Sequence, residues 1–109
     1  VDLAQLYDCF TPALLIQLED LGFCEKGAGG QYLQSGITKP GGALPVNTHG
    51  GMLSHCHPGN PGAFFGLTEA IRQLWGQAGE RQQQNLQHVL LHAQGGIMSS
   101  HATLIIGAR

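Results

Sequence analysis

Apolar residues recur at helical spacing in two stretches of this chain, and elsewhere they gather in short runs that predict strands. Residues 12–21 place leucines on one helical face. Thr11 is suited to cap this helix, Pro12 to occupy its first turn and Gly22 to end it. A second amphipathic helix is predicted over residues 61–77, where alanine, leucine and isoleucine follow the same spacing.

The shorter apolar runs predict three strands. Residues 1–10 indicate a strand that leads into a turn, and residues 89–92 and 102–106 indicate two buried strands joined as a hairpin by Gly95 and Gly96. Residues 23–46 are a long glycine-rich connection, in which residues 31–33 are compatible with a short strand. Residues 80–86 are polar and predict a solvated loop. We therefore expect an α/β fold, with helices packed on a mixed sheet, formed as one domain by residues 1–109.

The charge of the chain leaves the predicted fold unchanged but excludes some classes of function. The chain has 109 residues, a formal net charge of −2 and 11% charged residues. We find no basic patch for nucleic acid and no apolar run long enough to span a membrane, so we expect a cytoplasmic protein. The low charge predicts a surface that meets other protein, as in a homodimer or higher oligomer. With Val1 in place of a methionine, the low charge also suggests a fragment or subunit of a longer protein. Cys9, Cys24 and Cys56 are expected to be free thiols.

Most residues that bear chemistry gather in residues 47–62, where glycine and proline disfavour regular structure. Such a loop can bring backbone N–H groups and imidazoles against a small reacting group. His49, His55, Cys56 and His57 are also ligand types that zinc accepts. Adjacent Cys56 and His57 cannot readily both face one tetrahedral ion, however, and no second ligand pair follows, so we expect no metal. A phosphate-binding loop is disfavoured because no Gly-Lys-Ser/Thr follows the glycines.

Three segments, in the expected order, resemble the C-terminal part of the thiolase superfamily. Residues 7–11 (Tyr-Asp-Cys-Phe-Thr), which precede a helix, are similar to the Asn-Glu-Ala-Phe segment of thiolases. Residues 92–96 (His-Ala-Gln-Gly-Gly) stand where thiolases place a cysteine and a glycine turn. The middle segment, similar to the thiolase signature Asn-x-x-Gly-Gly…Gly-His-Pro-x-Gly-x-x-Gly, is Asn47-x-x-Gly50-Gly51 running to Cys56-His57-Pro58-Gly59-x-x-Gly62.

The resemblance covers nearly the whole chain and implies a thiolase-like C-terminal domain that acts on acyl-CoA, with no cofactor beyond the coenzyme A of the substrate. Two departures from the thiolase pattern narrow the resemblance to one subfamily. His92 stands at the thiolase cysteine, with no cysteine after Cys56, and Tyr7 stands at the thiolase asparagine. Residues 7–11 and 18–23 look more like lipid-transfer proteins or sterol carrier protein X thiolase-like proteins. Some members of that subfamily are aldolases of steroid side-chain degradation, which use tyrosines in place of cysteines and pair with a zinc-ribbon/OB-fold partner protein.

The resemblance implies a role for several side chains. His57 would polarise the acyl thioester carbonyl, because imidazole can donate a hydrogen bond to developing enolate charge. Tyr7 would act as acid or base on the β-hydroxyl of the substrate. His55, which an extended loop points to the same side as His57, could add a second polar group. His92 could occupy the cysteine site.

Backbone groups and one amide complete the expected site. N–H groups at Gly50, Gly51, Gly95 and Gly96 could approach the thioester and form an oxyanion hole, because no side chain keeps the backbone away. Asn47 could hold a catalytic water or orient His57.

Each of these residues also has a structural interpretation. His57 can be a loop histidine packed on Pro58, Tyr7 a core tyrosine at a strand end, His55 a surface histidine and His92 a satisfied core histidine. The glycines can serve turn geometry alone.

Retro-aldol cleavage of a β-hydroxyacyl-CoA is the activity that the resemblance favours. One alternative is thiolytic acyl transfer, with the nucleophilic cysteine supplied by residues outside this chain. Another is a non-catalytic lipid-transfer or assembly subunit that keeps the fold.

Overall fold

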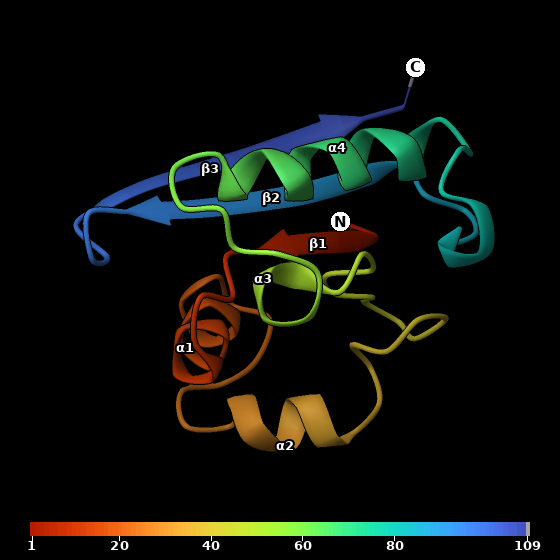
Figure 1. Cartoon of the computed structure of the whole chain (residues 1–109). Helices are drawn as coiled ribbons and strands as arrows, with labels where there is room; N and C mark the ends of the chain where they lie inside the picture. The colour runs from red at the N-terminus through yellow and green to blue at the C-terminus, as the bar shows by residue number, and fades with distance from the viewer. Residues whose placement is uncertain (109) are drawn as a thin grey trace.

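The computed structural model describes residues 1–108, in which a three-stranded sheet separates two helical layers (Figure 1). The strands follow the order β1-β2-β3, with β1 parallel to β2 and β2 antiparallel to β3, so the predicted mixed α/β fold is confirmed. The elements are, in chain order, β1 (Leu3–Leu6), α1 (Thr11–Asp20), α2 (Gly29–Gln34), α3 (Gly51–Ser54), α4 (Gly62–Leu74), the 3-10 turn η1 (Gly79–Arg81), β2 (His88–Gly95) and β3 (Ser100–Gly107).

Each face of the sheet carries its own apolar cluster. The cluster under α4 contains Leu3, Ala70 and Val89, and the cluster under α1 contains Ala4, Leu6, Leu18 and Leu90. All four residues of β1 are buried because helices cover both of its faces. Since strand side chains alternate, His92 and Gln94 of β2 lie on the α1 face with Leu90.

Helix α1 forms over the predicted residues, but its cap differs from the prediction. Thr11 is the first helical residue, and Phe10 occupies the cap position without a side-chain hydrogen bond. Pro12 lies in the first turn, where its missing N–H costs nothing. Gly22 follows the helix with φ +78°, as expected for a glycine that ends a helix. Helix α4 is confirmed, although it ends at Leu74, earlier than predicted.

Two other predictions are wrong. Residues 31–33 lie in α2 rather than in a strand, because the N–H groups of Tyr32 and Ser35 donate to carbonyls four residues back. The strand predicted over residues 102–106 forms within β3, but it is exposed and only Ile106 is half-buried. β3 is an edge strand of the sheet, so within the sheet it is hydrogen-bonded to β2 alone.

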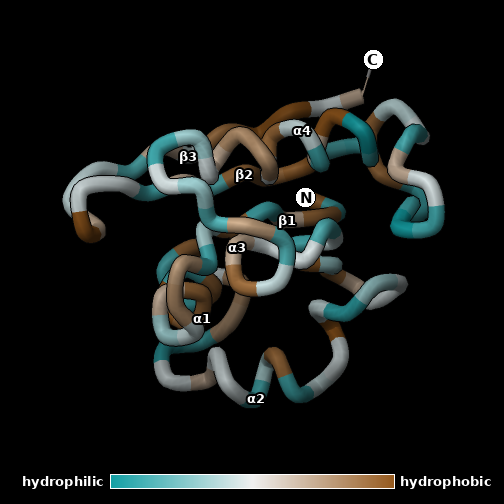
Figure 2. Tube along the Cα trace, viewed as in Figure 1, coloured by the Kyte–Doolittle hydropathy of each residue, from teal (hydrophilic) through white to brown (hydrophobic). Residues whose placement is uncertain are grey.

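Hydrophobic residues concentrate along the strands, and a further hydrophobic stretch marks the turn that joins β2 to β3 (Figure 2). Ile97 in this turn is 99% exposed. Among residues 1–108 no helix has the length and apolar character needed to cross a bilayer.

Candidate active site

Tyr7 leaves the sheet at the end of β1, and side-chain amides fix the direction in which it leaves. The buried Gln17 of α1 accepts a hydrogen bond from the Tyr7 N–H at 3.0 Å and donates to the Tyr7 carbonyl at 2.7 Å. Asn47 holds Leu6 in the same way, accepting at 2.7 Å and donating at 3.0 Å. The two side-chain amides thus supply the backbone of Leu6 and Tyr7 with the hydrogen bonds that a neighbouring strand would otherwise provide. Asn47 is therefore placed as a strand anchor, and its predicted role with water or His57 stays a prediction.

Gln17 is a positioning residue that the sequence interpretation missed. The sequence did carry a signal for this role, because Gln17 is a polar residue among the apolar positions of the first helix. The structure buries it together with Ala13 and Leu18. A buried amide needs hydrogen-bond partners, and here the backbone of Tyr7 provides them.

Asp8, also missed, organises the loop of residues 47–62. Its carboxylate accepts hydrogen bonds from the N–H groups of Met52 at 2.7 Å and Leu53 at 3.5 Å. Those N–H groups belong to the first turn of α3 and have no partner within the helix. Gly51 lies so close that an added Cβ would stand 2.6 Å from the Asp8 carboxyl carbon. The loop predicted to be irregular thus contains one helical turn, which a buried carboxylate stabilises.

His57 and Tyr7 lie together at a cavity of about 240 Å³. Their rings meet edge to face, with centroids 5.8 Å apart. The Gly59 N–H donates to His57 Nδ1 at 3.3 Å, so the neutral imidazole carries its proton on Nε2. His57 therefore offers an N–H donor, as its predicted role requires. Gln94, Gly95 and Gly96 line the same cavity, and Phe10, Ile97 and Met98 form an exposed apolar rim.

The surroundings of Tyr7 favour its neutral form. Burial raises the pKa of the Tyr7 phenol, and the nearby Cys9 raises it further. The phenolate thus needs compensation before Tyr7 can accept a proton.

His55 does not face the same cavity as His57, contrary to the prediction. The helical turn α3 ends at His55, whose φ of −95° and ψ of −72° are not extended. Its ring packs 5.6 Å from the ring of His49 and 5.6 Å from that of Phe65, in a second cavity that Glu69 also lines. Burial lowers the pKa of His49, whose Nδ1 has no partner among the described residues.

His92 pairs in register with Leu6, next to Tyr7, but its ring is engaged with β3. Its Nδ1 lies 2.8 Å from Thr103 Oγ1 and its Nε2 lies 3.3 Å from His101 Nδ1. His101 Nε2 lies 2.9 Å from the Met98 carbonyl, which can only accept. With both imidazoles neutral, the Thr103 hydroxyl therefore donates to His92, His92 donates to His101, and His101 donates to the Met98 carbonyl. A role for His92 as the base stays a prediction.

The predicted oxyanion glycines lie in two places. Gly95 and Gly96 line the cavity of Tyr7 and His57, whereas Gly50 and Gly51 open α3 with φ of +103° and +65°. The Gly50 N–H donates to the Asn47 carbonyl at 2.8 Å, so loop closure already uses this group. Across residues 1–108 no three His, Cys, Asp or Glu side chains converge to hold a metal ion.

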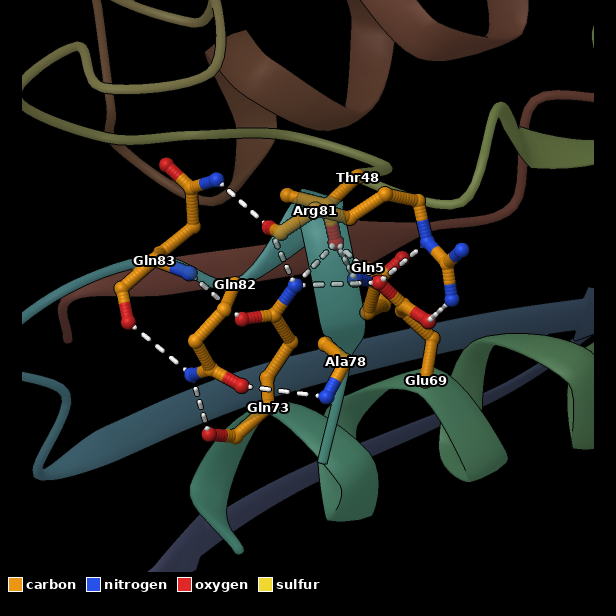
Figure 3. A network of polar contacts seen from close by, with 8 residues as sticks. All are labelled: Gln5, Thr48, Glu69, Gln73, Ala78, Arg81, Gln82 and Gln83. Carbon is orange, nitrogen blue, oxygen red and sulfur yellow. Dashed lines mark hydrogen bonds and ion pairs between the residues drawn. The ribbon is translucent and has the colours of Figure 1, made fainter. Parts of the chain in front are cut away.

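A polar network behind the loop connects Thr48 to α4 and η1 (Figure 3). Its centre is Glu69, 3% exposed, which accepts hydrogen bonds from Thr48 at 2.8 Å, from Gln73 at 3.0 Å and from Arg81 at 3.0 Å. Burial by itself raises the pKa of Glu69, but hydrogen bonds from Arg81, Gln73 and Thr48 outweigh it, and the pKa is lowered. The network holds the start of the loop against the helix.

The same network corrects the prediction for residues 80–86. Gln82 and Gln83 are half-buried rather than solvated. Gln82 donates to the Gln73 carbonyl at 2.9 Å, and the Gln83 N–H donates to the Gln73 side chain at 2.9 Å. The amides replace water as hydrogen-bond partners, which composition alone does not reveal.

The fold and the loop define a class of protein. The family model for the thiolase C-terminal domain-like family matches residues 1–108, and the chain belongs to this family. It is 43% identical over 109 residues to a 17-hydroxy-3-oxo-4-pregnene-20-carboxyl-CoA lyase of Mycobacterium tuberculosis, covering 98% of this chain and 26% of that protein. It is 38% identical over 96 residues to an acetyl-CoA acetyltransferase of Methanothermobacter thermautotrophicus, covering 88% of this chain and 25% of that one.

A solved structure, an Ltp2-ChsH2(DUF35) aldolase, matches with a TM-score of 0.86 and 38% identity, covering 99% of this chain and 27% of that chain. The predicted resemblance to thiolases and steroid side-chain aldolases is thus confirmed. The chain spans about a quarter of the length of these relatives.

Proposed function

We propose that the protein carrying this chain cleaves a carbon–carbon bond of a β-hydroxyacyl-CoA by retro-aldol chemistry. The observation that carries the proposal is the placement of Tyr7 and His57 at one cavity, with rings 5.8 Å apart. The identity to a lyase and to an aldolase structure supports it. Steroid or other lipid side chains are the proposed acyl groups.

The two side chains have complementary tasks in this proposal. His57 donates its Nε2–H to the thioester oxygen and stabilises the enolate as the bond breaks. Tyr7, as phenolate, takes the proton of the β-hydroxyl group. The electron pair of the O–H bond forms the product carbonyl, and the electron pair of the broken C–C bond moves onto the thioester as the enolate. The Tyr7 phenol then returns its proton to the α-carbon, so charge and protons balance.

Substitution of Tyr7 tests this assignment. Tyr7→Phe should lower ketone or aldehyde release from a β-hydroxyacyl-CoA by about 100-fold or more, because it removes the only proposed proton carrier. The release rate of the wild type should increase from neutral to alkaline pH, since the raised pKa keeps Tyr7 protonated at neutral pH. Product release that is unchanged in Tyr7→Phe, or a rate that falls with pH, contradicts the role of Tyr7.

Thiolytic acyl transfer is the second candidate, since the Cys9 thiol lines the same cavity and an acetyltransferase is among the relatives. That reaction consumes free coenzyme A, whereas retro-aldol cleavage does not. A Cys9→Ser variant that loses coenzyme-A-dependent cleavage of a β-ketoacyl-CoA would favour this candidate. A lipid-transfer or assembly subunit would bind acyl-CoA and show no turnover in either assay.

We further propose that the protein works with a second subunit, of the zinc-ribbon/OB-fold kind, because the matching aldolase structure is named for two components. Its assembly as a homodimer or larger oligomer, its cytoplasmic location and the absence of a further cofactor stay predictions. Light scattering of the protein with and without its partner would measure the assembly.

A further inference from the structure

Gln94 is one of the residues that line the cavity of Tyr7 and His57, and its side chain carries an unpaired polar atom. The residue is 8% exposed, and its buried Oε1 accepts no hydrogen bond from the described residues. Its Nε2 donates to Cys9 Sγ at 3.3 Å, and a sulfur is a weak acceptor. An unpaired buried amide oxygen is unfavourable, and a hydrogen-bond donor on a ligand would relieve it.

The surroundings of Gln94 define the ligand further. Phe10, Ile97 and Met98 line the cavity with exposed apolar side chains, and Ile97 and Met98 hold left-handed backbones with φ of +55° and +62°. An apolar wall with one buried acceptor fits an apolar chain that carries a single hydroxyl. The last torsion of a glutamine is soft, so the amide can turn its oxygen toward such a hydroxyl.

We propose that Gln94 selects β-hydroxyacyl thioesters over β-ketoacyl thioesters by accepting a hydrogen bond from the β-hydroxyl of the substrate. This inference rests on the proposed function and names the substrate class of the same site. The β-hydroxyl can donate to Gln94 while its oxygen accepts from the neutral phenol of Tyr7. A β-ketone has no proton to donate and leaves the Gln94 oxygen unpaired, which is the situation in which polar sites discriminate most.

The hydrogen bond to Gln94 belongs to the bound substrate and not to the transition state. The β-hydroxyl proton must leave Gln94 when it moves to the Tyr7 phenolate. Loss of the Gln94 oxygen should therefore weaken binding and raise KM and kcat together, while kcat/KM stays nearly unchanged.

The experiment compares Gln94→Met with the wild type in the full-length protein and its partner. Methionine keeps the length of the side chain and removes both polar amide atoms. Gln34→Met is the matched control, because Gln34 is an exposed glutamine at the end of α2. Dissociation constants are measured by calorimetry for β-hydroxyoctanoyl-CoA, β-oxooctanoyl-CoA and octanoyl-CoA, which share one carbon skeleton.

The wild type and Gln34→Met should bind the β-hydroxyacyl probe about tenfold more tightly than the other two, and Gln94→Met should bind all three alike within about twofold. Equal binding of the probes by the wild type, no measurable binding of the β-hydroxyacyl probe, or a preference kept by Gln94→Met overturns the inference. Thermal unfolding of Gln94→Met checks that the variant is folded.

The binding assay also separates this inference from the proposed function. If the wild type shows a hydroxyl preference that Gln94→Met loses, yet releases no ketone or aldehyde, the retro-aldol proposal is wrong and the role of Gln94 stands. If the protein cleaves its substrate and Gln94→Met keeps the preference, the role of Gln94 is wrong and the retro-aldol proposal stands.

Discussion

Gly51 is a position where this fold leaves no room for a side chain, and Gly51→Ala tests why. The residue has φ +65°, a conformation that costs an alanine about 1–2 kcal/mol. Its Cβ would also overlap the Asp8 carboxylate, with 2.6 Å to the carboxyl carbon. Asp8 is buried and holds the N–H groups of Met52 and Leu53, so it can move only by giving up these bonds.

The expected magnitude is the sum of these two effects. A hydrogen bond to a charged group contributes about 1.5–3 kcal/mol, and at least the 2.7 Å bond from Met52 would be lost. With the backbone penalty added, Gly51→Ala should lower the free energy of unfolding by about 2.5–5 kcal/mol. Gly59→Ala is the matched control, because Gly59 has φ +77° and no atom within 4 Å of its added Cβ, so it carries the backbone penalty alone.

Thermal unfolding of the full-length variants measures the difference. Gly51→Ala should lower the melting temperature by about 2–3 °C more than Gly59→Ala does, because the unfolding entropy of so long a protein is large. In an Asp8→Ala background the overlap is absent, and the two glycine substitutions should then cost nearly the same. Equal shifts for the two variants with Asp8 present would refute the steric argument.

Two further predictions concern stability. Because hydrogen bonds lower the pKa of Glu69 in the fold, its contribution to stability is fully present above the unfolded pKa and is lost as pH falls through the folded value. The melting temperature should therefore decrease less between about pH 6 and pH 3 in Glu69→Gln than in the wild type, and an equal decrease would contradict the assignment. Ile97→Gly should raise the free energy of unfolding by about 1 kcal/mol, since φ +55° strains a β-branched residue and its 99% exposed side chain buries nothing within this chain. A lower melting temperature of Ile97→Gly would instead show that this side chain is covered in the full-length protein.

The sequence predicted the two longer helices and the strands because their signals are local. Leucine spacing and Gly22 define α1, and the apolar run at Val89 defines the buried part of β2. It also predicted the family from the loop around His57, since two glycines, a His-Pro pair and a following helix coincide in the thiolase pattern.

Contacts between segments decided the rest. An extended geometry places His55 and His57 together, but the single turn of α3 separates them, and that turn depends on Asp8, more than forty residues earlier in the chain. The exposure of β3 depends on its position at the sheet edge, which the apolar run of residues 102–106 does not encode.

The chain by itself therefore determined its two longer helices, its strands, its family and His57 as the leading candidate. Tertiary structure alone decided how Tyr7 is held and which polar atoms remain unpaired. Gln17 holds the backbone of Tyr7, and Asn47 holds that of the preceding Leu6, through hydrogen bonds that span 10 and 41 residues. Gln94 faces a cavity built by three segments. Side-chain hydrogen bonds are short and directional, so their partners follow from the packing of distant segments rather than from local sequence.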